Sequence, residues 1–359
     1  MGEIDLLEGL VEVQEGLARI LVPRGHTVKG PGRVSGSPFY NRTMAFPRHV
    51  SVLFLEAIGS KVRRVLDGLS STGVLGIRLT LETNDEFEIT LNDRRRDAHD
   101  LIVRNVELNG VGHARATCED LNSLLCREHF EYVDVDPFGS PVPFVDNALR
   151  SLRPKGFLGV TATDAAALAG TYPRTCLRRY GTVSIKAPFS HEAGLRILAG
   201  YIVRTAAKYD MAARPLLSLW REHYYRAYFE LLRGARRADD AVRELGYVHY
   251  QPRGPRGIEP RGEVGPLWKG PLYDDELLGR MRARDYMPRD VSRYLEMWQA
   301  ESRAPPLFYT TDEVASRLRI QAPSMKRVLG RLSDAGFVAC RTSFHPKGFK
   351  TTASWDEVL

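Results

Sequence analysis

Val65-Leu66-Asp67-Gly68-Leu69-Ser70-Ser71-Thr72-Gly73-Val74-Leu75-Gly76 is the stretch that decides the fold. An apolar run ends in an acid, a glycine-containing turn follows, and a second apolar run begins, which predicts a strand, a turn and a helix. Glycines in such a turn let the backbone approach a nucleotide-like ligand closely. The spacing is not Gly-x-Gly-x-x-Gly, so a dinucleotide dehydrogenase fits poorly, and an ordinary strand-to-helix turn is the alternative.

Apolar runs alternate with amphipathic stretches on both sides of this turn. We expect strands at 62–67, 87–91, 132–136 and 157–163 and helices near 46–59, 73–81, 94–109, 143–152 and 191–209. The alternation predicts an α/β fold with a doubly wound parallel sheet. Two late strands, at 215–220 and 224–232, predict an antiparallel hairpin added at one edge of that sheet.

The composition changes after residue 232, so we expect two domains. The first, 1–232, begins with an extension at 1–45 that holds a Gly/Pro-rich loop at 25–38. The second, 233–359, is expected to be α+β. Its Pro-, Gly- and Arg-rich stretch at 252–271 predicts irregular structure. A helical segment at 274–301 and a winged-helix-like segment at 307–359 follow, the latter with helices at 310–318 and 323–335 and strands at 337–342 and 349–353.

Composition indicates a polyanionic partner and a reducing compartment. The formal net charge is +7 with a pI near 9.2, and 51 residues are Lys or Arg, which favours nucleic acid. The four cysteines show no Cys-x-x-Cys spacing, so we expect no metal site and no disulfide framework. No apolar run reaches the roughly 20 residues of a membrane helix, and we expect a cytoplasmic protein.

The sharpest chemical signal is Val133-Asp134-Val135-Asp136-Pro137-Phe138-Gly139-Ser140-Pro141. It resembles the (Asp/Asn)-Pro-Pro-(Tyr/Phe) motif of amino-methyltransferases. The exocyclic amine of a base is a poor nucleophile because its lone pair is delocalised, and hydrogen bonds to a carboxylate and a backbone carbonyl localise that pair. Proline lacks an N–H and fixes φ, so the carbonyls of Asp136 and Pro137 can be held in place. A plain turn, or Asp134 in place of Asp136, is the alternative.

Two further positions complete this chemistry. Phe138 can stack on the face of a base that has left its helix, a movement that costs a few kcal/mol. Asp93 ends the next strand and can accept both hydroxyls of a ribose. A helix N-cap is the alternative for Asp93.

Many ordered matches give the chain a resemblance to the tRNA (guanine-26, exocyclic amine) dimethyltransferases, closest to the archaeal form. The markers lie at 15–20, 39–41, 66–67, 71–73, 91–93, 134–141, 159–164, 191–192, 206–210, 223–227, 270–272, 341–342, 348 and 350–351. The resemblance implies a Rossmann-like class I methyltransferase that uses S-adenosylmethionine to methylate guanine 26 of tRNA twice. It also implies a separate C-terminal tRNA-binding domain, and we expect a monomer.

The resemblance implies roles for single residues. Asp136 would orient and deprotonate the guanine amine, and the base would be bound by Phe39, Tyr40, Pro137 and Phe138. The cofactor would be bound by Arg48, Asp67, Gly73, Asp93, Asp120 and Leu121. Within that set Arg48, placed just before the first helix, would meet the methionine carboxylate, Asp93 the ribose, and Asp120 and Leu121 the adenine. A solvated helix-start arginine is the alternative for Arg48, and a surface turn for Asp120.

The C-terminal strands mix basic and aromatic residues. Arg341 and Lys350 are expected to contact tRNA phosphates, with a solvated hairpin as the alternative. The chain departs from the family at Leu75, where an arginine is usual, and Arg78 lies one helical turn on as a possible substitute. Two other functions compete: methylation of another base amine, in rRNA or DNA, and a non-enzymatic winged-helix binder of RNA or DNA.

Overall fold

The computed structural model describes residues 9–27, 38–83, 86–252 and 254–359. The chain divides into two compact units. The first comprises Met1–Pro137, Phe144–Val160 and Met281–Val291, and the second comprises Phe138–Pro143, Thr161–Arg280 and Ser292–Leu359. This division does not follow the predicted domain boundary at residue 232, because residues 161–280 group with most of the C-terminal part.

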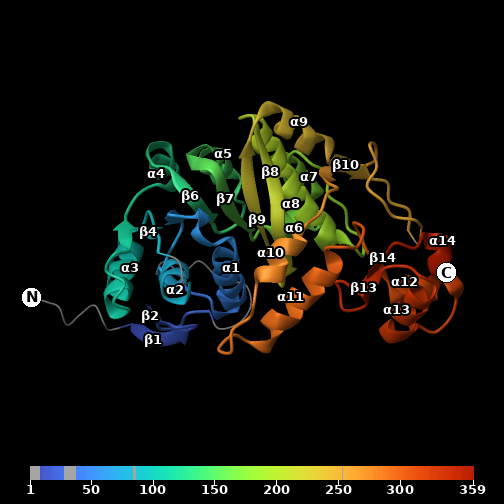
Figure 1. Ribbon diagram of the computed structural model, residues 1–359, viewed down its shortest axis with the longest axis horizontal. Coiled ribbons are helices and arrows are strands. Elements are labelled where there is room, and N and C mark those ends of the chain that lie inside the picture. The colour runs from blue at the N-terminus through green and yellow to red at the C-terminus, as the bar shows by residue number, and fades with distance from the viewer. Residues whose placement is uncertain (1–8, 28–37, 84–85, 253) are drawn as a thin grey trace, which may run out of the picture. The chain divides into compact units, whose positions relative to one another are not determined.

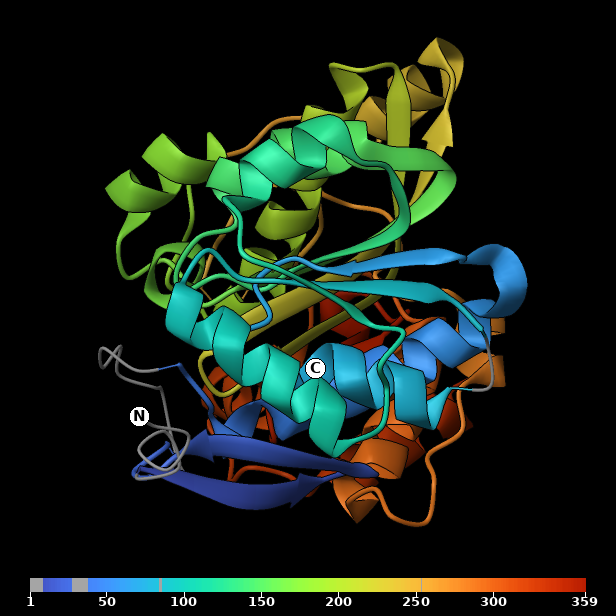
Figure 2. The ribbon, with the colours of Figure 1, turned by 90° about the vertical axis from the view of Figure 1, so that its left-hand side faces the viewer.

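The first unit alternates strands and helices. Its elements in chain order are β1 (Leu10–Glu15), β2 (Ala18–Pro23), α1 (Ala45–Ile58), β3 (Arg64–Asp67), α2 (Val74–Glu82), β4 (Glu88–Asn92), α3 (Arg96–Leu108), β5 (Arg115–Thr117), α4 (Leu121–Arg127), β6 (Phe130–Val135), α5 (Val142–Ser151) and β7 (Leu152–Ala162), with the last two reaching into the second unit. Helices α1, α2 and α3 cover one face of the strands, and α4 and α5 cover the other (Figures 1 and 2). The doubly wound arrangement predicted from the sequence is confirmed.

A seven-stranded sheet has the order β5-β4-β3-β6-β7-β9-β8. Strands β5, β4, β3, β6 and β7 are parallel, and the register pairs Asp67 of β3 with Asp134 of β6. Val65 and Leu66 are fully buried, as expected for a parallel strand covered on both faces. The strand order places the carboxyl ends of β4, β3 and β6 side by side, at the edge where open α/β sheets bind ligands.

The N-terminal hairpin β1–β2 packs its turn onto α2. Gly16 adopts φ +59, and a Cβ there would lie 2.1 Å from a carboxylate oxygen of Glu82. Only glycine therefore suits this turn. The Leu17 N–H donates to the same carboxylate at 3.0 Å, which ties the extension to α2. The Gly/Pro-rich loop predicted at 25–38 lies mostly outside the described residues.

The second unit holds the antiparallel end of the sheet. Its elements are α6 (Ala165–Leu168), α7 (Pro173–Tyr180), α8 (Ser190–Ala207), β8 (Met211–Arg221), β9 (Tyr224–Arg233), α9 (Ala235–Arg243), β10 (Leu245–Val248), β11 (Val264–Trp268), α10 (Asp275–Arg280), α11 (Arg289–Glu301), β12 (Tyr309–Thr310), α12 (Thr311–Leu318), α13 (Met325–Asp334), β13 (Ala339–Arg341), β14 (Gly348–Thr351) and α14 (Trp355–Val358). The predicted hairpin at the sheet edge is confirmed as β8 and β9.

Two sequence predictions for this part of the chain need correction. The stretch at 252–271 is not wholly irregular, because β11 pairs with β10 in a separate two-stranded sheet. The helical segment predicted at 274–301 is two helices, α10 and α11, with Pro288 immediately before the second. Pro288 lacks an N–H and has a fixed φ, so it suits the start of a helix and not the interior of one long helix.

The last fifty residues contain the two helices and the strand pair expected for a winged-helix-like segment. Strands β12, β14 and β13 form an antiparallel sheet. Side chains from this sheet and the neighbouring helices form a small hydrophobic core: Tyr309, Val314, Leu332, Phe349, Ala353 and Trp355. The assignment to the winged-helix fold stays a prediction. Among the described residues, none of the helices has both the length and the apolar character needed to cross a membrane.

Candidate active site

Three acids follow neighbouring strands of the sheet. Asp67 ends β3, Asp93 comes directly after β4, and Asp136 comes directly after β6. Since β4, β3 and β6 are parallel neighbours, these residues share one edge of the sheet. The strand order therefore brings together acids that lie as far as 69 residues apart in the chain.

The glycine turn between β3 and α2 is bonded to the strands on either side. The Gly68 N–H donates to the carbonyl of Asp134 at 3.0 Å, and the Ser70 N–H donates to the carbonyl of Asn92 at 2.8 Å. A Cβ on Gly68 would lie 2.8 Å from that Asp134 carbonyl oxygen. Gly73, at φ +77, begins α2 in the left-handed conformation that glycine adopts readily. The turn is thus packed close to the strand ends, as a nucleotide-like ligand requires.

Asp67 lies in the interior of this turn. Its side chain accepts a hydrogen bond from the Gly76 N–H at 3.3 Å, and the residue is buried. Burial, followed by the charge of Asp134, raises the pKa of Asp67 to about 7, and the charge of Asp136 acts in the same direction. At neutral pH the carboxyl is therefore protonated in a large fraction of molecules, which reduces the repulsion between these acids.

Asp93 is half-buried and points at the glycine turn. One carboxylate oxygen accepts from the Ser71 N–H at 3.1 Å, and the other accepts from the Arg95 N–H at 3.0 Å. Helix α3 has Arg95 as its N-cap with no side-chain cap, so the helix N-cap alternative does not describe Asp93. Its position beside the turn is the one expected for a group that binds a ribose.

The two residues implied for adenine have different environments. Asp120 is exposed and is the N-cap of α4, where its carboxylate accepts from the Ser123 N–H at 3.1 Å. This carboxylate is engaged in capping, as in the surface-turn alternative. Leu121 is buried, and its side chain lies against Gly68 of the glycine turn.

The loop after β6 presents its aromatic residue to solvent. Asp136 is half-buried, Pro137 is buried and Phe138 is 57% exposed. Gly139 adopts φ +86, and its N–H donates to Thr163 Oγ1 at 2.6 Å. The Gly139 carbonyl accepts from the Thr163 N–H at 2.9 Å. Thr163 therefore holds the backbone at the end of the motif from two sides.

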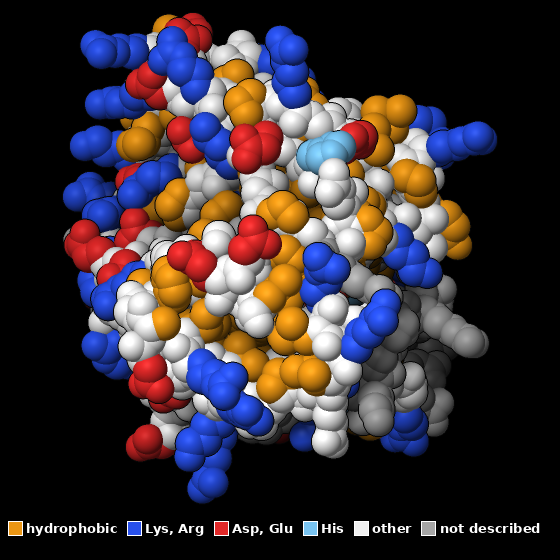
Figure 3. Space-filling view, turned by 90° about the vertical axis from the view of Figure 1, so that its right-hand side faces the viewer, with side chains coloured by type: hydrophobic (Ala, Val, Ile, Leu, Met, Phe, Trp, Pro, Cys, Tyr) orange, Lys and Arg blue, Asp and Glu red, His pale blue; other side chains and the backbone are white. Residues whose placement is uncertain are grey.

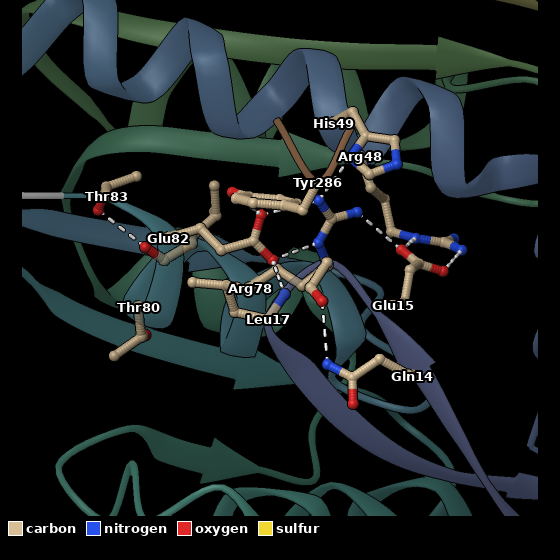
Figure 4. Close-up of polar contacts among 12 residues, drawn as sticks. Gln14, Glu15, Leu17, Arg48, His49, Arg78, Thr80, Glu82, Thr83 and Tyr286 are labelled. Carbon is tan, nitrogen blue, oxygen red and sulfur yellow. Dashed lines mark hydrogen bonds and ion pairs between the residues drawn. The ribbon is translucent and has the colours of Figure 1, made fainter. Parts of the chain in front are cut away.

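Arg48 lies within the first turn of α1 rather than before the helix. Its guanidinium donates from Nε and Nη2 to the carboxylate of Glu15, at 2.6 and 2.5 Å (Figure 4). It also donates to the carbonyl of Asn41. Burial lowers the pKa of Arg48, but the charges of Glu15 and Asp136 raise it, and the result is an upward shift. Arg48 is thus a half-buried cation, held by Glu15, and the charge of Asp136 acts on it.

The same carboxylate also binds Arg78, which is fully buried. Arg78 donates to Glu15 at 2.9 Å, to both oxygens of Glu82 at 2.7 and 2.8 Å, and to His49 Nδ1 at 2.7 Å (Figure 4). Each of the three nitrogen atoms of its guanidinium therefore donates to a partner within the first unit. Arg78 therefore has a structural place and does not substitute for the cofactor contact in doubt at Leu75.

This network lowers the pKa values of both Glu15 and His49 from their ordinary values. Burial raises the pKa of Glu15, but Arg48 and Arg78 lower it more, to about 2. Burial and then Arg78 lower the pKa of His49 to about 4. Because Arg78 can only donate, His49 Nδ1 is the acceptor, and the imidazole is neutral in the folded protein.

The segment at 39–41 is bonded to both the turn and the network. The Phe39 N–H donates to Ser71 Oγ at 2.8 Å, and Ser71 Oγ donates to the Phe39 carbonyl at 2.7 Å. Tyr40 is buried, and its hydroxyl donates to Glu15 at 2.7 Å. We therefore withdraw Tyr40 from the expected base-binding residues, since the residue is only 4% exposed and presents no ring face to a base. Phe39 keeps its place beside the glycine turn.

The expectation that Lys350 contacts tRNA is wrong. Its ammonium is buried, donates to Glu192 at 2.8 Å and lies 3.6 Å from Glu301. A lysine enclosed by two carboxylates cannot reach a phosphate. Arg341, on β13, is exposed, as a phosphate contact would require.

Sequence reasoning missed the residues that support the site rather than form it. Glu15, Ser71 and Thr163 all stood within quoted markers, but no role was assigned to them. Their partners are 22 to 63 residues distant in the chain, as in the bonds of Asp93 to Ser71 and of Arg78 to Glu15. The available signal was a polar residue next to an apolar strand or at a tight turn. Among the described residues there is no group of three or more His, Cys, Asp or Glu able to hold a metal ion.

The chain is similar to a family of known proteins over nearly its whole length. The model of the family described as N2,N2-dimethylguanosine tRNA methyltransferase matches residues 16–359. The tRNA (guanine(26)-N(2))-dimethyltransferase of Pyrococcus horikoshii is 38% identical, over 97% of this chain and 96% of the relative. The protein of the same name from Thermococcus kodakarensis is 40% identical, over 97% and 98% of the two chains.

A solved structure is similar to this chain over nearly its whole length. The structure of Trm1 from Pyrococcus horikoshii in complex with S-adenosyl-L-methionine superposes with a TM-score of 0.87 at 37% identity, covering 97% of this chain and 98% of the other. Fold, length and sequence therefore agree. The chain belongs to the N2,N2-dimethylguanosine tRNA methyltransferase family.

Proposed function

We propose that this chain uses S-adenosyl-L-methionine to methylate the exocyclic amine of guanine 26 in tRNA twice. The relatives named above as tRNA (guanine(26)-N(2))-dimethyltransferases support the reaction, and the neighbour with bound S-adenosyl-L-methionine supports the methyl donor. The observation that carries the proposal is the position of Asp136. Its half-buried side chain follows β6 directly, and its charge acts on both Arg48 and Asp67.

The residues present suit S-adenosyl-L-methionine. The packed glycine turn would lie against its nucleoside, with Leu121 beside it and the carboxylate of Asp93 at the ribose hydroxyls. Arg48, fixed by Glu15, would supply positive charge for the methionine carboxylate. When bound, the cofactor supplies an electrophilic methyl group on a sulfonium.

Asp136 would act on the amine. Its carboxylate accepts a hydrogen bond from one N–H, the Pro137 carbonyl accepts from the other, and Phe138 stacks on the base. As the nitrogen forms its bond to the methyl carbon, the bond from that carbon to the sulfonium sulfur would break and leave a neutral thioether. One amine proton would pass to Asp136 and then to water, which a half-buried carboxyl can reach. The singly methylated amine keeps one N–H, so the same carboxylate serves a second transfer.

The tRNA partner fits the charge of the molecule. Lys and Arg side chains gather along one edge of the face shown in Figure 3, and the formal net charge is +7. Such an excess favours a polyanion through release of counterions. We expect the protein to act in the cytoplasm as a monomer and without a metal ion.

The test is methyl transfer followed by mapping. The full-length protein is incubated with methyl-labelled S-adenosyl-L-methionine and unmodified tRNA, and the nucleosides are analysed by mass. We expect N2,N2-dimethylguanosine at position 26 and no product from a tRNA with adenine there. Label found only in rRNA or DNA would support the competing amine methyltransferase, and absence of cofactor binding by calorimetry would support a non-enzymatic binder.

A further inference from the structure

Helix α7 has an outward face that combines cations with apolar side chains. Tyr172, at its N-cap, is 60% exposed and Leu177 is 52% exposed. Arg174, Arg178 and Arg179 are exposed on the same short helix. Large apolar side chains this exposed are uncommon when they are clustered, and a cluster of them indicates a contact surface.

The charged side chains of Lys and Arg outnumber the acids near this helix in the sequence. Residues 165–191 contain four basic residues, Arg174, Arg178, Arg179 and Lys186, and no Asp or Glu. Of the helix arginines, Arg179 pairs with Asp164 at 2.9 Å. Within the described part of the chain, neither Arg174 nor Arg178 has a carboxylate at ion-pair distance. A local excess of arginine without compensating acids favours an anionic partner.

The inward face of α7 is bonded to the loop that carries the catalytic motif. Tyr180 is fully buried, its hydroxyl accepts from Ser140 Oγ at 2.9 Å, and it donates to Asp164 at 2.7 Å. Ser140 directly follows Gly139, the end of the Asp-Pro-Phe-Gly motif. The helix is therefore bonded to the loop two residues after the exposed Phe138.

We propose that the outward face of α7 binds the tRNA next to the nucleotide being methylated. This proposal rests on the proposed function. Arg174 and Arg178 bind phosphates on the strand that flanks the target, and Tyr172 stacks on a base left unstacked when the guanine moves out. The combination of arginine and an exposed aromatic residue suits RNA with a disturbed stack better than a regular double helix.

The test compares two double variants of the full-length protein, with S-adenosyl-L-methionine bound. R174A/R178A removes two charges from α7, and R236A/R237A removes two from the exposed face of α9, a helix of similar length in the same unit. Affinity for unmodified tRNA is measured by filter binding at several salt concentrations, together with steady-state methylation. A third variant, R174K/R178K, restores the charge, and Y172F keeps the ring while Y172A removes it.

We expect R174A/R178A to weaken tRNA binding about tenfold and to lower the salt slope by about one to two, while cofactor affinity stays unchanged. The Michaelis constant of R174A/R178A for tRNA should rise. R174K/R178K should recover most of the lost tRNA affinity, and Y172A should bind tRNA more weakly than Y172F. If R174A/R178A lost no tRNA affinity, or only as much as R236A/R237A, the proposal that α7 binds tRNA would be overturned, while the methylation proposal would stand. Conversely, tRNA binding that depends on α7 without any methyl transfer would overturn the proposed function and retain the surface. If the outward face of α7 bound an acidic protein in preference to tRNA, the proposal that this face binds tRNA would also be overturned.

Discussion

At the scale of single residues, the buried charges of the first unit depend on one carboxylate. Glu15 is 5% exposed and compensates both Arg48 and Arg78. Removing one partner from a buried ion pair leaves an uncompensated charge, which costs more than the pair itself contributes. Glu12, on the same strand, pairs with Arg19 in solvent, where exposed ion pairs contribute little.

Glu15→Gln should therefore lower the free energy of unfolding by about 3 kcal/mol at pH 7. The folded pKa of Glu15, about 2, means that its charge is fully present at this pH. Denaturant unfolding of the variant and of Glu12→Gln, the matched control, measures the effect. If the two variants were equally stable, Glu15 would not be the centre of the network.

His49 predicts a pH dependence of stability. Its folded pKa of about 4 lies below the unfolded value of 6.5, so between these pH values the unfolded chain binds a proton that the folded protein does not. Stability is lost as the pH falls through this window, by on the order of 3 kcal/mol at most. Asp67 acts in the opposite sense, because its folded pKa of about 7 lies above the usual 3.8.

The variant His49→Asn separates these contributions. Its side-chain oxygen can accept the hydrogen bond from Arg78 but does not titrate. We expect wild-type protein to lose more thermal stability than the variant between pH 6.5 and pH 4. Parallel melting-temperature profiles for the two proteins across this range would show that His49 is not the titrating group.

At the scale of elements, the loop after β6 depends on the end of β7. Thr163 bonds to Gly139 through its backbone N–H and through its hydroxyl, which accepts the Gly139 N–H. Thr163→Val removes the second bond without changing the size of the side chain, and a hydrogen bond of this kind contributes about 1 kcal/mol. Thr163 is a positioning residue, because it acts through the loop and not on the substrate.

We expect Thr163→Val to lower kcat about tenfold, since small misplacements of reacting groups are costly. Affinity for S-adenosyl-L-methionine should hardly change, and Thr163→Ser, which keeps the hydroxyl, should restore the rate. Steady-state kinetics with calorimetry measures both quantities. Failure of the serine variant to recover the rate would assign the loss to packing rather than to this hydrogen bond.

The sequence predicted the helices and strands well where a run of apolar or amphipathic residues marks the element. The alternation of apolar runs predicted β3, β4, β6 and β7 with helices α2, α3 and α5, but not α4, and two adjacent runs predicted the edge hairpin β8–β9. It did not predict β5, whose three residues are Arg-Ala-Thr, or β11, which contains Gly and Pro within a Pro-, Gly- and Arg-rich stretch. Short strands carry too few residues for a periodic signal.

The candidate site shows the same limit. Asp67, Asp93 and Asp136 could be predicted because each follows an apolar strand, and strand order then brings them together. Tyr40 and Lys350 were misjudged because burial and ion pairing are tertiary properties. A lysine in a basic–aromatic stretch looks exposed in sequence, yet Lys350 is enclosed by Glu192 and Glu301.

At the scale of the whole molecule, the predicted boundary at residue 232 divides a compact unit. Helix α8 packs against β8 and β11, and its Arg196 donates to the carbonyls of Trp268 and Gly270 at 3.0 and 2.9 Å. Glu192, also on α8, is paired with Lys350 of β14. Cutting the chain at 232 would remove Lys350 and the two carbonyls, and would leave the buried Glu192 and Arg196 with only each other as ionic partners.

A fragment of residues 1–232 should therefore lack cooperative thermal unfolding and should expose hydrophobic surface. Circular dichroism melting, with the full chain as reference, tests this expectation. A fragment that melts cooperatively within a few degrees of the full chain would instead support the two domains predicted from the sequence.

The central claim is that the carboxylate of Asp136 activates the guanine amine, and Asp136→Ala tests it most directly. Methyl transfer to unmodified tRNA is measured with labelled S-adenosyl-L-methionine, and cofactor affinity is measured on the same sample. We expect the rate to fall by at least about 100-fold, as for loss of a general base, while cofactor binding survives. Turnover retained near the wild-type rate in that variant would contradict the role given to Asp136.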